Sequence, residues 1–196
     1  ACHSDHLDFK LDGHTWKAAF GSSSIGLCSP TIFFSVRVLL FVFWFVVFIW
    51  SQVDWVNSKD SFMENYLYSY WWTQLTHQTL FVELAYLGFA AATTGSALFG
   101  SVQDGTGDAT PWFVSVTWAL QPAVLVASLL VFLLYWLLLY SGGSVAAISI
   151  MTHGVNFGIM LIDMTICRQP LYLAHVFMPI AYALWYISFS LIYYAA

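Results

Sequence analysis

Polar side chains interrupt the apolar stretch "WWTQLTHQTLFVELAYLGF", residues 71–89. Thr76 lies near its start, and an imidazole, His153, occurs further along the chain in "SIMTHGVN". A threonine hydroxyl becomes an effective nucleophile when an imidazole within hydrogen-bond reach takes its proton. Thr76 and His153 could therefore act as nucleophile and general base in acyl transfer. The alternative is structural: Thr76 bonds to its own helix, and His153 joins two helices.

The composition restricts where such a pair could work. Of the 196 residues, 60% are hydrophobic and only 8% are charged, which is typical of a polytopic membrane protein. The net charge of −5 provides no basic patch, so nucleic acid is not an expected partner. Cys2, Cys28 and Cys167 have neither paired spacing nor an even number, so we expect no disulfide framework and no cysteine-based metal site.

The elements that must position the polar groups are membrane helices. We predict an all-α transmembrane bundle at residues 30–196, preceded by a polar arm at 1–29, with room for a further C-terminal span. The predicted spans are 31–50, 71–99, 113–140, 145–167 and 171–196. Lys10, Lys17 and Arg168 would share one side of the membrane against Lys59, which predicts a cytosolic N-terminus; the organelle is left open.

Counting residues places the polar groups in depth. The second and fourth spans start from the same membrane face. At ~1.5 Å per residue, Thr76 and His77 lie roughly 8–9 Å deep and His153 roughly 12 Å deep, so the three can meet in one leaflet. Two imidazoles at one depth could also hold a haem, but the other leaflet has no second pair. We therefore expect no cofactor and no metal.

Two charged residues lie deeper in the predicted spans. Glu83 lies roughly 18 Å from the face where the second span starts, and Arg37 reaches roughly 9 Å from the opposite face. In a hydrocarbon core of ~30 Å these depths bring the two side chains near each other. An unpaired charge in the bilayer is costly, so the sequence predicts a structural Arg37–Glu83 ion pair.

Four segments together resemble a known family. They are "SVRVLL" in the first span, the "LT" of "QLTHQTLF", "LLYW" in the third span, and "MTHGVNFGIMLIDMTICRQPLYLAHVFMPIAYALWYISFSLIYYAA". With these segments the chain resembles the rolling stone family, from about Phe9 to its end. That family is related to the androgen-induced membrane hydrolases that cleave fatty-acid esters of hydroxy fatty acids.

The resemblance implies site residues. In the hydrolases the proposed catalytic pair is a threonine in the second span and a histidine in the fourth, which correspond to Thr76 and His153. Where the hydrolases carry an Asn-His pair ahead of that histidine, this chain has Ser149 and Ile150. Rolling stone proteins themselves are linked to cell fusion and development.

Two functions follow as hypotheses. The first is a lipid-ester hydrolase acting within the bilayer, with Asn156 or Gln74 donating a hydrogen bond to the oxyanion. The second is a non-catalytic membrane interaction protein, or an accessory subunit of a larger membrane complex. Membrane lipids, and in the second case other membrane subunits, are the expected partners.

Overall fold

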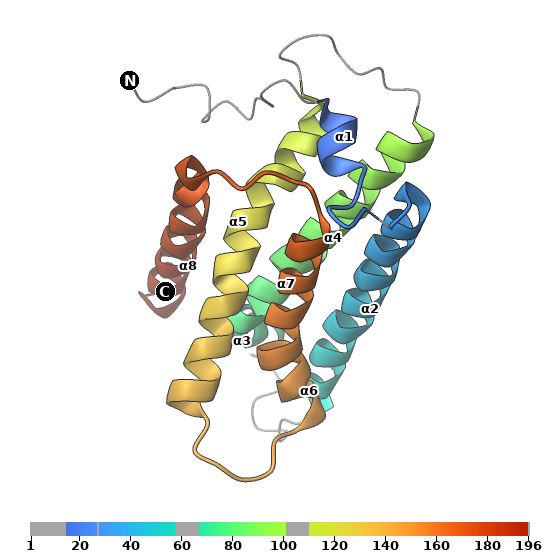
Figure 1. The fold of residues 1–196 in the computed structure, drawn as a ribbon. Coiled ribbons are helices and arrows are strands. Elements are labelled where there is room, and N and C mark those ends of the chain that lie inside the picture. Colours follow the sequence, from blue (N-terminus) through green and yellow to red (C-terminus); the bar gives the residue numbers. More distant parts are fainter. Residues whose placement is uncertain (1–14, 27, 58–66, 101–109, 196) are drawn as a thin grey trace.

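The computed structural model describes residues 15–26, 28–57, 67–100 and 110–195. Within these residues the chain is all-α, and five helices are long and apolar enough to cross a membrane (Figure 1). The five candidate spans are Pro30–Asn57, Leu75–Phe99, Trp112–Leu139, Ala147–Ile166 and Leu173–Ala195. The chain is therefore an integral membrane protein with a helical bundle. The predicted fold class is confirmed.

The individual elements follow the apolar runs of the sequence. The first span is α2, Pro30–Asn57. It begins with proline at a position where no backbone N–H is needed, and the Ser29 hydroxyl accepts a hydrogen bond from the Ile32 N–H at 3.3 Å. The third span is α5, Trp112–Leu133, continued by η3, Leu134–Leu139. A turn with Gly142 and Gly143, both at positive φ, leads to the fourth span.

The remaining spans are segmented. The fourth consists of α6 (Ala147–Ile150), η4 (Met151–Val155) and α7 (Asn156–Ile166). The fifth begins with η5, Leu173–Val176, and continues as α8, Phe177–Ala195. The second span, predicted as one helix over 71–99, is divided into α3 (Leu67–Thr73) and α4 (Leu75–Phe99).

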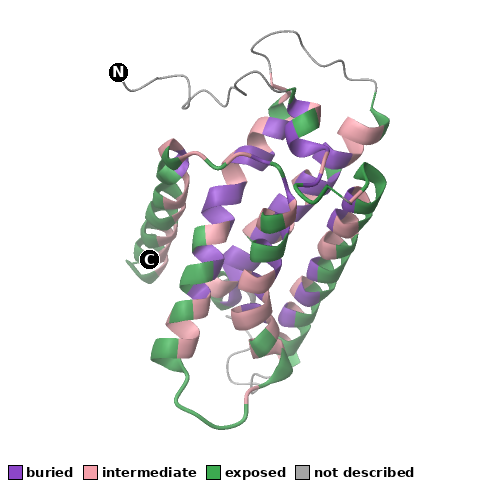
Figure 2. Cartoon of the chain, viewed as in Figure 1, coloured by how far each residue is buried: buried purple, intermediate pink, exposed green. Residues whose placement is uncertain are grey.

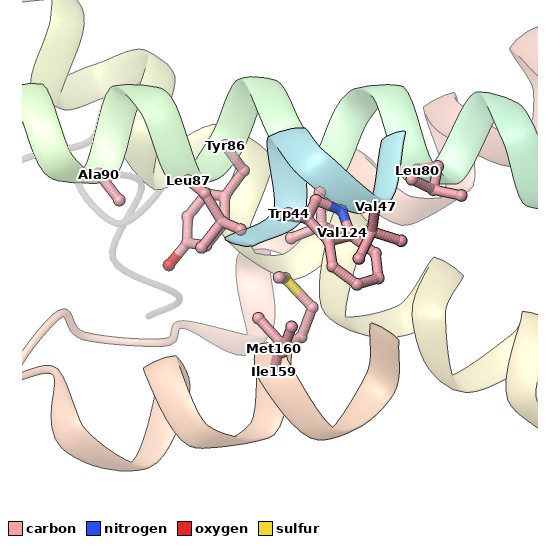
Figure 3. Close-up of a cluster of buried hydrophobic side chains, with 9 residues drawn as sticks. All are labelled: Trp44, Val47, Leu80, Tyr86, Leu87, Ala90, Val124, Ile159 and Met160. Atoms are coloured by element: carbon pink, nitrogen blue, oxygen red, sulfur yellow. The ribbon is translucent and has the colours of Figure 1, made fainter. Parts of the chain in front are cut away.

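The core of the bundle forms around α4, which packs against both α2 and α5. Figure 3 shows apolar side chains of α2, α4, α5 and α7 meeting there. The cluster consists of Trp44, Val47, Leu80, Tyr86, Leu87, Ala90, Val124, Ile159 and Met160. Because Leu80 and Leu87 have no exposed surface, their face of α4 must point into the bundle.

A short helix, α1 (Trp16–Phe20), covers one end of the bundle. It begins at Thr15, whose hydroxyl accepts a hydrogen bond from the Ala18 N–H at 3.2 Å. Trp16 and Phe20 are buried with Val114 and Trp118 of α5. The later part of the predicted polar arm is therefore packed onto the bundle.

The last span is the least buried. In α8, whose residues are all described, no residue is buried, and Figure 2 shows the helix without buried positions beside α5. Its main contact is with α5. The four preceding spans therefore carry the packed core, and α8 lies at its edge.

Candidate functional site

His153 lies on a turn of π-helix, a wider turn than the α-helix. In η4 the Asn156 N–H bonds to the Met151 carbonyl five residues back, instead of four. The same pattern recurs in η3, where the Tyr140 N–H bonds to the Tyr135 carbonyl at 2.8 Å. Such π-turns occur frequently at functional sites, because the extra residue redirects side chains.

The two π-helical segments contact each other through His153. Its imidazole stacks on the Tyr135 ring with centroids 3.9 Å apart and an interplanar angle of 1°. The Trp136 indole N–H donates to the His153 carbonyl at 3.1 Å. The Nδ1 atom of His153 is buried and has no hydrogen-bond partner in the described part of the chain. The ring is thus held in place from one side while one of its nitrogens stays unused.

Close to this region the second span is broken at Gln74, whose backbone is extended (φ −82°, ψ 131°). A break leaves carbonyl groups at the end of α3 without helical partners, and the lipid core cannot satisfy them. Side chains of α4 do so instead. His77 Nδ1 lies 2.9 Å from the Trp71 carbonyl, and Gln78 Nε2 donates to the Trp72 carbonyl at 2.8 Å. Two of the polar residues that interrupt residues 71–89 therefore form hydrogen bonds to the backbone carbonyls at this break.

The bond to Trp71 also assigns the protonation of His77. A carbonyl oxygen can only accept, so Nδ1 of His77 must carry the hydrogen. The ring is stacked on Trp71 with centroids 4.3 Å apart. The hydrogen bond and the stacking hold the His77 ring in one orientation. His77 is therefore better suited to satisfying the carbonyl at the helix break than to moving a proton as a general base.

Thr76 is half-buried in the first turn of α4. It lies one turn before Leu80 and two turns before Glu83, both fully buried, so it occupies the interior face of the helix. No hydrogen bond joins Thr76 to His153 in the described part of the chain. Thr76 therefore faces the interior of the bundle, but it is not hydrogen-bonded to His153.

The elements that carry them are nonetheless neighbours. The segment η4, which carries His153, packs against α2, α4 and α5, and α4 carries Thr76 and His77. The helix break, η3 and η4 all belong to the same end of the bundle, because the second span starts there, the third ends there and the fourth starts there. Three interruptions of regular helix therefore gather at one membrane face.

Among the described residues, no side-chain hydrogen bond joins either of the two predicted supporting residues to Thr76 or His153. Asn156 is buried, and its Oδ1 accepts a hydrogen bond from the Phe157 N–H at 2.6 Å, which leaves its amide nitrogen for donation. Gln74 is half-buried, and its side chain does not cap α4.

The predicted Arg37–Glu83 ion pair is wrong. Arg37 binds Asp163 through two bonds, Nε to Oδ1 at 2.9 Å and Nη2 to Oδ2 at 3.1 Å. The reason is depth. Arg37 lies seven residues after the start of α2, roughly 10 Å from the end of the bundle where α2 begins. The helix α4 ends at the same end of the bundle, and Glu83 lies sixteen residues before that point, at a depth of roughly 24 Å. Asp163 is close to the end of α7 and matches Arg37 in depth.

Glu83 itself is completely buried, and neither carboxylate oxygen meets hydrogen-bond geometry with a described group. The Trp44 indole and the Tyr182 hydroxyl are polar groups in its neighbourhood. Tyr182 lies on α8 and shares a hydrogen bond with Thr79 at 3.0 Å. A carboxyl group without a cation in this setting is expected to be neutral.

The described residues contain no group of three His, Cys, Asp or Glu side chains arranged to hold a metal ion. The segment "CHSDH" at residues 2–6 lies outside the described residues.

The chain matches no family model, no curated protein and no solved structure. The site must therefore be interpreted from its own geometry.

Four residues that matter here were given no role by the sequence-based prediction. Tyr135 and Trp136 hold His153, but in the sequence they look like two more aromatic residues of an apolar span. Asp163 was visible as an acidic residue in the fourth span, and its depth was the available signal for pairing with Arg37. The Tyr86 hydroxyl, which donates to Asp163 Oδ2 at 2.6 Å, had no such signal.

Proposed function

We propose that the chain is a lipid-ester hydrolase embedded in the membrane, with Thr76 as nucleophile and His153 as general base. The observation that carries the proposal is that three helix interruptions gather at the end of the bundle that holds the half-buried His153 imidazole, whose Nδ1 is buried and unused among the described residues. Irregular backbone at membrane depth is costly and is found mainly where it lines a cavity or serves a site. The resemblance to the rolling stone family and its hydrolase relatives supports the same two residues.

The chemistry would proceed in two steps. The Thr76 hydroxyl attacks the ester carbonyl while His153 takes its proton, and His153 then returns that proton to the leaving alcohol. Water next hydrolyses the acyl-threonine, with His153 as base again. The amide nitrogen of Asn156 would donate to the oxyanion. Because Thr76 and His153 are not bonded in the free chain, the pair must close when substrate binds, as catalytic hydrogen bonds often do.

The test is hydrolysis of a fluorogenic long-chain ester by the purified chain in detergent, together with labelling by a fluorophosphonate probe. Thr76→Ala should abolish both, and His153→Ala should lower kcat by roughly 10²–10⁴-fold. Thr152→Ala is the matched control, since Thr152 precedes His153 but bonds to the Ile148 carbonyl at 3.0 Å. A wild-type chain that takes no probe, or full turnover by Thr76→Ala, would overturn the proposal.

A second candidate rests on α8. We infer that a non-catalytic interaction protein, or an accessory subunit, would place a partner helix against this span, which buries no residue although the window of α4 is 44% buried. The exposed side chains of α8 that face away from the bundle include Leu184, Leu191 and Ile192. Native mass spectrometry from a mild detergent extract distinguishes the two functions: a constant stoichiometric partner supports the second, and a lone active chain supports the first.

A further inference from the structure

A groove of about 300 Å³ opens between α3, α4 and α8. Aromatic side chains from all three helices form its walls, among them Trp72, Phe81 and Trp185. Val82 of α4 also lines the groove. This volume is at the small end of the roughly 300–1,000 Å³ range of ligand pockets, enough for one chain or one ring system.

One polar residue of the groove has an unmet hydrogen-bonding group. Gln78 is 8% exposed, and its Nε2 donates to the Trp72 carbonyl, which fixes the orientation of the amide. Its Oε1 is buried and has no hydrogen-bond partner among the residues that the structure describes. The other polar group of the groove, the Tyr182 hydroxyl, is already bonded to Thr79. A desolvated acceptor without a donor destabilises the chain unless something supplies the donor.

The groove is separate from the Thr76 and His153 region. Gln78, Phe81 and Val82 project from α4 on the side opposite to Thr76, since two residues along a helix turn the direction by about 200°. The groove faces α8, whereas Thr76 faces the interior of the bundle. Whatever binds in the groove is therefore independent of the proposed hydrolysis.

We propose that this groove binds one lipid alcohol, whose free hydroxyl donates to Gln78 Oε1 and whose single chain or fused rings lie against the aromatic walls. The lining includes no cationic side chain, so an anionic headgroup finds no counter-charge there. The volume excludes a lipid with two full chains. Gln78 is four residues past the helix break, roughly 6 Å into the span, which is a suitable depth for a hydroxyl at the membrane interface.

The experiment uses the full chain in lipid nanodiscs with photoreactive probes. A diazirine-bearing sterol and a diazirine-bearing long-chain alcohol are each compared with the corresponding methyl ether, which lacks the donor. We expect labelled peptides from α4 and α8, with about fivefold more labelling by one of the alcohols than by its ether, the factor that an ordinary hydrogen bond provides. Which alcohol is preferred distinguishes a ring system from a chain.

Two variants make the test specific. Val82→Trp fills the groove and should remove the labelling, whereas Val126→Trp, on the exposed side of α5, should leave it unchanged. Gln78→Leu should reduce the ratio of alcohol to ether labelling to about one. Equal labelling of wild type by alcohol and ether, or labelling that survives Val82→Trp, would overturn the proposal. The alcohol-to-ether comparison needs only the wild-type chain. It therefore tests the proposal even if Gln78→Leu fails to fold.

Discussion

Arg37 and Asp163 form a bidentate pair without exposed surface, and further groups complete it. Arg37 Nη1 donates to the Thr94 hydroxyl at 2.9 Å, and the Tyr86 hydroxyl donates to Asp163. The Phe20 carbonyl accepts from the Thr94 hydroxyl at 3.1 Å. A buried pair adds little net stability compared with apolar residues, but removing one partner leaves a charge in the bilayer. Replacing either partner should therefore destabilise the chain, because the remaining charge stays buried and unpaired.

Asp163→Ala should lower the free energy of unfolding by roughly 3–5 kcal/mol, because it leaves Arg37 buried and unpaired. Glu83→Gln should cost much less, since Glu83 has no cationic partner. Thermal unfolding in detergent measures both, with Asp54→Ala at the exposed end of α2 as control. If Glu83→Gln proved as damaging as Asp163→Ala, the depth argument for the Arg37–Asp163 pair would fail.

Tyr135 should act as a positioning residue if the hydrolase proposal holds. Replacing it by leucine removes the ring that stacks on His153, and misplacing a catalytic group by about 1 Å can cost up to about 100-fold in rate. Tyr135→Leu should therefore lower kcat with KM nearly unchanged, while Tyr135→Phe keeps the stack and the rate. A fall in thermal stability with unchanged kcat would show instead that Tyr135 only packs.

At the scale of elements, the sequence predicted the membrane spans, because these depend on long apolar runs. Such runs need a lipid-length helix, so all five spans were found, with ends shifted by a few residues. The break at Gln74 was not predicted, because no proline or glycine marks it. Its signal was the polar run around His77 and Gln78, whose function as partners for free carbonyls appears only in three dimensions. Pairing across helices likewise depends on depth differences that residue counting resolves poorly.

His77→Leu should weaken the junction of α3 and α4. It removes the 2.9 Å bond to the Trp71 carbonyl and leaves only the long 3.4 Å bond from the Gln74 N–H, so the cost approaches the about 1–3 kcal/mol of an unsatisfied buried group. Phe81→Leu, one turn further along α4 on an exposed side chain, serves as the control in the same thermal unfolding assay. Equal melting temperatures for His77→Leu and Phe81→Leu would mean that water or lipid headgroups already satisfy the carbonyl.

For the whole molecule, the two ends of the bundle differ. The helix interruptions lie at one end, while α1 and the segment after it close the other. Ser23 Oγ and the Ser24 N–H both donate to the Ile166 carbonyl, each at 2.8 Å. Next to this contact Cys167 is buried, and burial together with the nearby Asp163 charge raises the pKa of its thiol.

Cys167 should therefore react slowly with maleimide, and more slowly than the half-exposed Cys28. The raised pKa means that less thiolate is present at a given pH, so the rate at Cys167 should keep rising above the pH where an ordinary thiol levels off. Peptide mass spectrometry follows each cysteine separately. Ser24→Pro removes the N–H that binds Ile166 and should speed the reaction at Cys167, whereas Gly26→Ala, with open space around it, should not. Identical rates at Cys167 in both variants would contradict this role of the segment after α1.

The contact between Ser23 and Cys167 has a consequence for biosynthesis. The two residues form an antiparallel bridge, so the chain between them is a closed loop that contains the first four spans. The fifth span lies outside that loop, and α8, which forms most of this span, contributes no buried residue. Helices that insert one after another can pack before the whole chain has left the insertion machinery. The first four spans can thus complete their packing before α8 has left the ribosome.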